Sequence, residues 1–390
     1  MKTEILRAAL FTPISEGRWG LPILFWSDPG EGKTSVIREV CADYGLPCTV
    51  LSPGEMGEGA FGVIPVPDKS GVIKYPPPEW TLAHDDAGGV VFIDEMSSTP
   101  PALQPPLLGL LFARRIGGKT LSARTRVIGA ANPPEVAAGG FDLAPPVANR
   151  CGHIDWSAPT PDEHAAYMMS GSTGGRESTK KTFDAEAEEA RVLAAWPDAW
   201  AWAVGLETAF LRRRPGLKNK CPKAGDPKAS KAWPSDRSWE NATRALASAR
   251  VNGLSEVVRD EFVTSFIGSG PANEWFAFIA DSDLPDPSDV LDGKVRFSHD
   301  RTRLDRTAAV LTACVSLVTP NGAARRAERV SALWSLFAEL HEEKSLGDVL
   351  VPPVFAMTRA NLHAKEGRPL LAKMNNLLKA AGITVANAGL

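Results

Sequence analysis

The residues best suited to chemistry lie in a glycine-rich segment at 26–35, which reads W-S-D-P-G-E-G-K-T-S. It begins where the apolar run at 21–26 stops, and the helical pattern at 33–41 follows it. Gly30 and Gly32 allow the backbone to curl so that successive N–H groups point inward. The start of the helix adds the positive end of its dipole. A strand, a glycine-rich turn and a helix in this order predict a loop that binds phosphate.

Two side chains of this loop could contact a bound nucleotide. Lys33 and Thr34 match the end of the pattern G-x-x-x-x-G-K-[ST], so Lys33 would reach the β- and γ-phosphates and the Thr34 hydroxyl would hold Mg²⁺. Ser27 replaces the first glycine of the pattern, and serine resists positive φ. The alternative to a phosphate-binding loop is a simple turn before a helix. The expected phosphate site comprises Ser27, Asp28, Pro29, Gly30, Glu31, Gly32, Lys33, Thr34 and Ser35.

Two carboxylates follow a second apolar run. Residues 89–95 read G-V-V-F-I-D-E, which is typical of a parallel strand buried on both faces. Asp94 would lie at the carboxyl end of this strand, where α/β sheets bind ligands, and could hold Mg²⁺. Glu95 could orient and deprotonate a water that attacks the γ-phosphate. With a phosphate loop earlier in the same chain, we prefer this interpretation to two unrelated surface carboxylates.

A third buried strand is predicted at 126–131 (R-V-I-G-A-A), and Asn132-Pro133-Pro134 ends it. The Asn132 amide could position the same water or contact the γ-phosphate. It could equally be a turn asparagine that caps the strand. The residues alone leave both possibilities open.

Composition indicates a globular, cytoplasmic protein with two or three domains. The chain has 390 residues, of which 44% are hydrophobic, and no apolar run reaches the ~18 residues of a membrane span. The amino terminus is amphipathic rather than a signal peptide. A formal net charge of −3 provides no general attraction to nucleic acid. The five cysteines include no C-x-x-C pair, so neither a disulfide framework nor a zinc site is indicated: Cys41, Cys48, Cys151, Cys221 and Cys314.

Two hairpins interrupt the alternation of strands and helices. The Gly/Pro-rich insertion at 52–80 contains apolar pieces at 61–65 and 72–75, which predict a small hairpin. Phe61 and Tyr75 stand among turn residues, so we expect both to be exposed and to touch a partner. The alternatives are a solvated loop, or aromatic residues that pack the loop down. A second hairpin is predicted at 114–124, where Gly117-Gly118 makes the turn.

Beyond Pro159 the sequence predicts helices and no further strands. The segment at 212–231 carries eight Lys or Arg and one acid, Asp226. A solvated charge run explains it, although closeness to a bound triphosphate could also do so. Pro234 then opens a helix with Arg237 in its first turn.

Together these elements resemble the AAA+ ATPases, and within them the MoxR branch, over about residues 21–280. The segment S-D-P-G-E-G-K-T resembles Walker A, and V-V-F-I-D-E resembles Walker B. A-A-N-P-P is similar to the sensor 1 turn, with Asn132. A-N-R-C is similar to the arginine-finger position with Arg150, and W-P-S-D-R-S-W to the sensor 2 helix with Arg237. Ser27 departs from the family loop.

The resemblance implies a P-loop NTPase of the α/β class. A three-layer αβα core with a parallel sheet would occupy 1–157, an all-helical lid 158–280, and a helical C-terminal extension 281–390. The resemblance also implies that the protein binds ATP and Mg²⁺ and hydrolyses ATP. It implies a ring, usually a hexamer, that remodels or assembles a partner protein. That partner often has a von Willebrand factor A domain. Both hairpins would face that partner. The implied catalytic residues are Glu95, Asn132, Arg150 and Arg237, and the implied metal ligands are Thr34 and Asp94.

Arg150 precedes the last predicted strand, at 152–156, on an edge of the sheet away from Lys33. We therefore expect it to serve the nucleotide of a neighbouring subunit, as an arginine finger does. A salt bridge or a surface arginine is the alternative.

Two other functions compete with ATP-driven remodelling. One is a nucleotide switch that assembles on ATP with little turnover, and the presence of Glu95, Asn132, Arg150 and Arg237 argues against it. The other is a nucleic-acid motor or loader, which only the basic segment at 212–231 supports. A GTPase is disfavoured, since Asn219-Lys220 lacks the aspartate that reads guanine.

Overall fold

The structure is a computed structural model, and it describes two compact units of the chain. Residues outside the description are 62–63, 86–87, 138–139, 159, 170–182, 224, 301, 321–322, 324, 343–345 and 381–390. Unit 1 comprises Met1–Leu193 and Asn219–Asn273, and unit 2 comprises Ala194–Lys218 and Glu274–Leu390. The predicted domain boundaries after residues 157 and 280 remain predictions.

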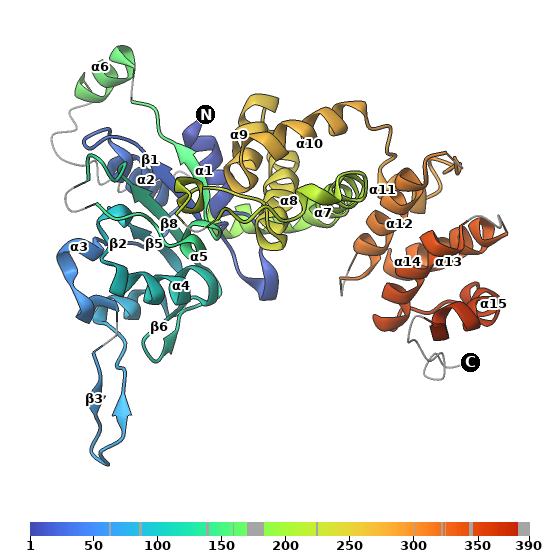
Figure 1. The fold of residues 1–390 in the computed structure, drawn as a ribbon, viewed down its shortest axis with the longest axis horizontal. Helices are drawn as coiled ribbons and strands as arrows, with labels where there is room; N and C mark the ends of the chain where they lie inside the picture. The colour runs from blue at the N-terminus through green and yellow to red at the C-terminus, as the bar shows by residue number, and fades with distance from the viewer. Residues whose placement is uncertain are drawn as a thin grey trace. The chain divides into compact units, whose positions relative to one another are not determined.

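A five-stranded parallel sheet forms the centre of unit 1 (Figure 1). Its strands lie in the order β2-β5-β8-β1-β9, so that β1 pairs with β8 on one side and β9 on the other. The apolar runs of the sequence correspond to these strands, and the predicted α/β core is confirmed. The strand bounds are β1 Ile23–Trp26, β2 Cys48–Leu51, β5 Gly89–Ile93, β8 Thr125–Ala131 and β9 Gly152–Asp155.

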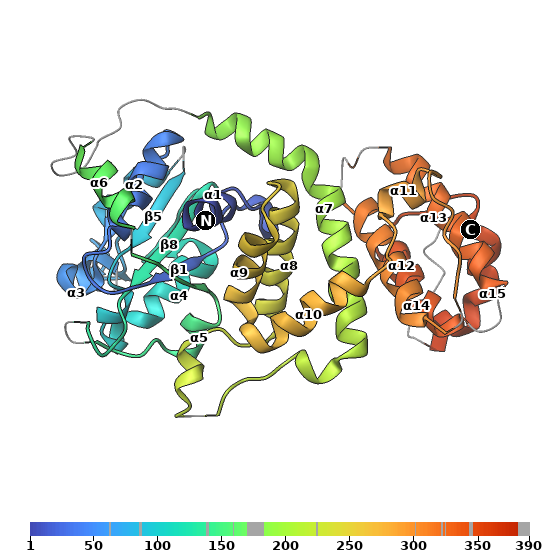
Figure 2. The same ribbon diagram turned by 90° about the horizontal axis from the view of Figure 1, so that it is seen from above.

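Helices cover both faces of this sheet (Figures 1 and 2). On one face α4 (Gln104–Ala113) and α5 (Pro145–Ala148) pack on a core that includes Leu24, Trp26, Val91, Ile93, Leu107, Leu110, Val127 and Val147. The other face carries α1 (Lys2–Leu10) and α2 (Lys33–Asp43). Because side chains alternate along a strand, each buried strand supplies both cores. This explains why the central strands β1 and β5 are continuously apolar in sequence.

The remaining helices follow the predicted pattern after the last strand of the sheet. In unit 1, α8 (Asp236–Val251) begins with Ser235, which accepts a hydrogen bond from the Ser238 N–H and is part of a capping box. None of the described helices is long and apolar enough to cross a membrane. The other helices are α3 Pro53–Met56, α6 Pro161–Met169, α7 Ala185–Arg213, α9 Glu256–Ile267, α10 Ser269–Asp281, α11 Pro287–Leu291, α12 Leu304–Val318, α13 Arg326–His341, α14 Gly347–Arg359 and α15 Gly367–Ala380.

Unit 2 has a helical core of its own. Trp334 lies at its centre, and its indole Nε1–H donates to the Leu362 carbonyl at 2.9 Å. Gly367 opens α15 directly against this ring, where an added Cβ would approach Trp334 Cδ2 to 2.5 Å. Glycine therefore allows α15 to pack. This core also buries an apolar stripe of α13: Val330, Leu333, Trp334, Phe337 and Leu340.

A buried arginine anchors the hairpin that precedes β8. The hairpin consists of β6 (Arg115–Ile116) and β7 (Lys119–Thr120), as predicted. Arg114 donates hydrogen bonds to the carbonyls of Thr125, Leu111 and Gly20, among others. Burial lowers the pKa of Arg114 to about 9. The guanidinium thus joins the start of β8 to α4 and to the residues before β1.

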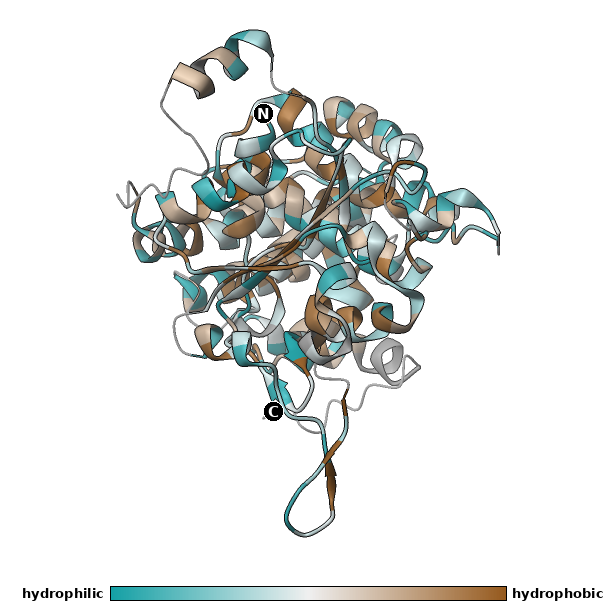
Figure 3. Cartoon of the chain, turned by 90° about the vertical axis from the view of Figure 1, so that its left-hand side faces the viewer, coloured by the Kyte–Doolittle hydropathy of each residue, from teal (hydrophilic) through white to brown (hydrophobic). Residues whose placement is uncertain are grey.

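The insertion after β2 forms a projecting hairpin, but one aromatic residue contradicts the sequence prediction. The strands are β3 (Val66–Pro67) and β4 (Ile73–Lys74), so the predicted hairpin is present and its first strand follows the predicted piece at 61–65, of which 62–63 lie outside the described residues (Figures 1 and 3). Tyr75 is 51% exposed, as expected. Phe61 is 0% exposed and belongs to the core under α4, because the turn before the hairpin folds back onto the sheet.

We expect Phe61→Ser to lower the free energy of unfolding by roughly 4 kcal/mol, since it removes a buried aromatic side chain and leaves a cavity. Tyr75→Ser is the matched control from the same insertion and should leave stability unchanged. Urea unfolding of both variants and the native chain measures the difference. Equal stability of the two variants would contradict the burial of Phe61.

Candidate nucleotide site

The glycine-rich loop lies between the carboxyl end of β1 and the first turn of α2. Gly30 has φ 85° and Gly32 has φ 77°, and an added Cβ would meet no atom within 4 Å at either position. Backbone conformation, not space, therefore requires glycine there. Ser27 does not adopt positive φ, so the strain expected from its replacement of glycine does not arise. Asp28, Pro29 and Gly30 are exposed at the tip of the loop.

The Lys33 side chain folds back across this loop and is only 7% exposed. Its ammonium nitrogen donates to Ser27 Oγ at 2.5 Å, the Ser27 carbonyl at 3.1 Å and the Asp28 carbonyl at 3.2 Å. A further hydrogen bond, of 2.9 Å, goes to Asn132 Oδ1. Burial lowers the pKa of Lys33, while the charge of Asp94 opposes this shift. An ammonium surrounded by neutral oxygens is well placed to bind an anion.

The structure also brings Thr34 to Asp94, although the two residues lie on different elements. Thr34 Oγ donates to Asp94 Oδ2 at 2.6 Å. Oxygen ligands of this kind suit Mg²⁺, so the pair fits the predicted metal position. Glu95 follows in the left-handed region with φ 53° and is exposed. Its N–H donates to Asp94 Oδ1 at 3.0 Å, so the turn that fixes Asp94 also directs Glu95 away from the sheet.

Asn132 faces Lys33, which distinguishes it from an asparagine that only caps a strand. It is 9% exposed, and its Oδ1 accepts from the Lys33 ammonium, which fixes the orientation of the amide. The Asn132 N–H donates to Ser97 Oγ at 3.2 Å. Ser97 thus ties Asn132 to the segment after Glu95. Sequence reasoning missed Ser97, because a serine two residues after a D-E pair carries no signal by itself.

Aromatic residues at the ends of β1 and β9 support the loop, and sequence reasoning missed these too. The Trp156 indole N–H donates to the Glu31 carbonyl at 3.1 Å. Trp26 Nε1–H donates to His153 Nδ1 at 3.0 Å, and His153 Nε2–H donates to the Ala148 carbonyl at 3.0 Å. The two bonds define a neutral imidazole. On the Trp26 ring lies Lys231, with its Nζ 3.5 Å from the centroid, so this cation of the basic segment packs beside the loop.

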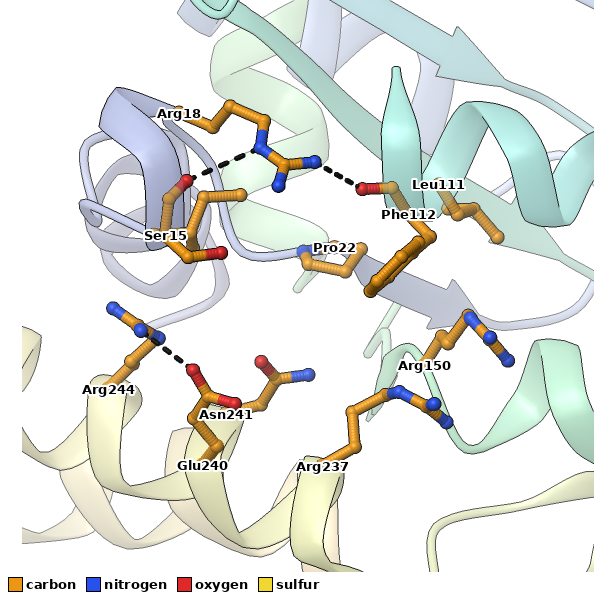
Figure 4. A pocket seen from close by; sticks show the side chains of 11 residues that line it. Ser15, Arg18, Pro22, Leu111, Phe112, Arg150, Arg237, Glu240, Asn241 and Arg244 are labelled. Atoms are coloured by element: carbon orange, nitrogen blue, oxygen red, sulfur yellow. Dashed lines mark hydrogen bonds and ion pairs between the residues drawn. The ribbon is translucent and has the colours of Figure 1, made fainter. Parts of the chain in front are cut away.

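Arg150 and Arg237 lie elsewhere, together in one cavity of about 90 Å³ (Figure 4). Arg150 donates to the Pro146 carbonyl at 2.6 Å, and its guanidinium lies over the Phe112 ring. Burial, and then the charge of Arg237, lowers the pKa of Arg150. Two further arginines line the cavity. Arg18 donates a hydrogen bond to the Phe112 carbonyl, and Arg244 donates one to the Glu240 carboxylate. The other lining residues are Ile14, Ser15, Pro22, Leu111 and Asn241.

This cavity lies at the amino ends of the strands, whereas the loop lies at their carboxyl ends. Pro22 lines it and directly precedes β1, and Arg150 shortly precedes β9, whereas the loop follows β1. A four-residue strand separates its two ends by roughly 10 Å or more. The structure therefore brings Lys33, Thr34, Asp94, Glu95 and Asn132 to one edge, and it does not bring the two arginines to them.

No protein-family model matches the chain, and no curated protein matches it in sequence. Among solved structures, it is similar to one from Cytophaga hutchinsonii that is described as a "putative ATPase". The two chains are 12% identical, and the match covers 72% of this chain and 87% of that one, with a TM-score of 0.46. Function is therefore inferred from the side chains of the site.

The neutral His153 predicts a pH dependence of stability. Burial lowers the pKa of His153 to about 4, from 6.5. As pH falls from about 6.5 to about 4, the unfolded chain takes up a proton here that the folded chain does not, so the free energy of unfolding should fall by up to about 3 kcal/mol. Urea unfolding at pH 7 and pH 4.5 tests this against His153→Gln, which should lack this part of the change. An identical pH dependence in both proteins would contradict it.

Proposed function

We propose that this protein is a Mg²⁺-dependent ATP hydrolase of the AAA+ type, in its MoxR branch. The observation that carries the proposal is the Lys33 ammonium shared between Ser27 of the loop and Asn132, which directly follows the neighbouring strand β8. Beside it, the Thr34 hydroxyl reaches Asp94. A cation, an amide and a hydroxyl–carboxylate pair around a glycine-rich loop match the demands of a triphosphate with its metal.

Each residue then has a distinct task in hydrolysis. Lys33 leaves its neutral oxygens for the β- and γ-phosphates, and the Asn132 amide, which already faces Lys33, contacts the γ-phosphate or the attacking water. Glu95 accepts the proton of that water, and its left-handed backbone turns it toward solvent. Thr34 and Asp94 would hold Mg²⁺, which neutralises charge on the phosphates.

We propose that Arg150 and Arg237 serve the nucleotide of a neighbouring subunit. Their support is position, since both line a cavity at the edge of the sheet away from the chain's own loop. The Arg150 Nε is buried and has no hydrogen-bond partner among the described residues, and the nearby charge of Arg237 disfavours a second cation. A phosphate would accept a hydrogen bond from the Arg150 Nε and would offset the repulsion between the two guanidinium groups. A site completed by a second copy implies a ring, and the resemblance suggests a hexamer.

The partner side of this ring is proposed to include the β3–β4 hairpin. Its apolar side chains are exposed, and a cluster of exposed apolar side chains is typical of an interaction surface. They are Ile64, Val66, Val72, Ile73 and Tyr75. The proposed activity is remodelling or assembly of a partner protein that carries a von Willebrand factor A domain. The basic segment at 212–231 gives weaker support to a nucleic-acid motor or loader than to a nucleotide site, because Lys231 packs on Trp26 beside the loop.

Lys33→Ala should abolish nucleotide binding, because it removes the cation that a triphosphate contacts in the ground state. Glu95→Gln should bind ATP as the native chain does and hydrolyse it at least about 100-fold more slowly, since a general base acts only in the transition state. Equilibrium binding of a fluorescent ATP analogue and steady-state phosphate release separate the two defects. Native turnover in Glu95→Gln would refute its role as the base, and negligible turnover in the native chain would favour a nucleotide switch.

Arg150→Ala should bind ATP normally and hydrolyse it about 10³-fold more slowly, because an arginine finger acts on the γ-phosphate of the neighbour. Mixing it with Lys33→Ala subunits, which still carry Arg150, should restore part of the activity through composite sites. Native mass spectrometry verifies that the oligomers are mixed. Lack of rescue in such oligomers would refute the action between subunits.

A further inference from the structure

Two cysteines lie together at the far end of the helix that follows the loop. Cys41 is in the last turns of α2, and Cys48 is the first residue of β2. Between them the chain reverses through Gly45 at φ 64°, with the Leu46 N–H donating to the Cys41 carbonyl at 2.9 Å. This tight reversal returns the chain beside the end of α2, and the two thiols are close enough to interact. Both cysteines are free thiols.

The two thiols differ in their surroundings. Their mutual interaction lowers the pKa of Cys48 and raises that of Cys41. Burial raises the pKa of Cys41 further, and this side chain is almost inaccessible. Cys48 is half-buried, and the positive charge of Arg38 also lowers its pKa. Cys48 is therefore the thiol that solvent can reach as a thiolate, and Cys41 lies beside it.

We propose that Cys41 and Cys48 form a peroxide-sensitive pair that closes reversibly to a disulfide. The Cys48 thiolate attacks hydrogen peroxide, which breaks the O–O bond, releases hydroxide and leaves a sulfenic acid on Cys48. The Cys41 thiol then attacks that sulfur. An S–S bond forms, the S–O bond breaks, and water leaves with the Cys41 proton. Two thiols and one peroxide thus give one disulfide and two waters.

The other cysteines of the chain do not offer this arrangement. Burial raises the pKa of Cys151 and of Cys314 to about 12, so neither is a ready nucleophile. Cys221 is exposed in the basic segment. The disulfide would tie the last turns of α2 to the first residue of β2. Because α2 carries Lys33 and Thr34 at its other end, the bond would join the helix of the phosphate loop covalently to the sheet.

Peptide mapping of the folded, full-length chain tests the proposal without reference to ATPase activity. The reduced protein is treated with hydrogen peroxide, blocked with N-ethylmaleimide and cleaved before aspartates. Cleavage before Asp28, Asp43 and Asp68 places the two cysteines on separate peptides. We expect peptides 28–42 and 43–67 to be joined while most Cys221 is still alkylated, and dithiothreitol to release them.

Single substitutions establish the order of the two steps. In Cys41→Ala, Cys48 should accumulate as a sulfenic acid that dimedone labels, whereas in Cys48→Ser, Cys41 should stay reduced. Cys221→Ser is the matched control and should form the disulfide as the native chain does. Thermal unfolding verifies that each variant is folded. Oxidation of Cys221 ahead of the pair, a linked product that also forms in urea at the same rate, or no labelling of Cys48 in Cys41→Ala would overturn the proposal.

Discussion

The buried ammonium of Lys33 is the constraint on which the site depends. A charged group at 7% exposure is costly unless polar atoms surround it, and here those atoms come from the segments that directly follow β1 and β8. The Ser27 N–H donates to the Ala131 carbonyl at 3.3 Å, which places Asn132 directly beside the loop. Asn132 is held in turn by Ser97. The pairing of β1 with β8 therefore decides whether Lys33 has its partners.

The same parallel sheet separates two kinds of positive charge. Its carboxyl edge carries the Lys33 site, with the carboxylates of Asp94 and Glu95 close by, and its amino edge carries the cavity of Arg150 and Arg237. Concentrating all of these cations at one edge would be repulsive in the absence of a ligand. The proposal that a second copy completes the site, and with it the proposed ring, rests on this division.

Local pattern predicted most of the fold correctly. Strands β1 and β5 were recognisable because burial on both faces makes them continuously apolar, and the β6–β7 hairpin was recognisable by Gly117-Gly118. The burial of Phe61 was not recognisable, because the Gly and Pro residues around it are typical of an exposed loop. Its burial depends on the sheet and α4, which local sequence does not contain. Trp156 and His153 were missed for the same reason, since their partners Glu31 and Trp26 lie far away in the chain.

By itself, the sequence determined the glycine-rich loop between a strand and a helix, the central apolar strands and the positions of Lys33, Thr34, Asp94 and Glu95 along them, because short-range backbone preferences and hydrophobic periodicity are local properties. Only the tertiary structure decided that Asn132 faces Lys33, that Ser27 avoids positive φ, and that Arg150 and Arg237 share a cavity. These outcomes depend on strand order and on side-chain packing. Both are set by hydrogen bonds and burial between residues distant in the chain, and a local pattern contains neither.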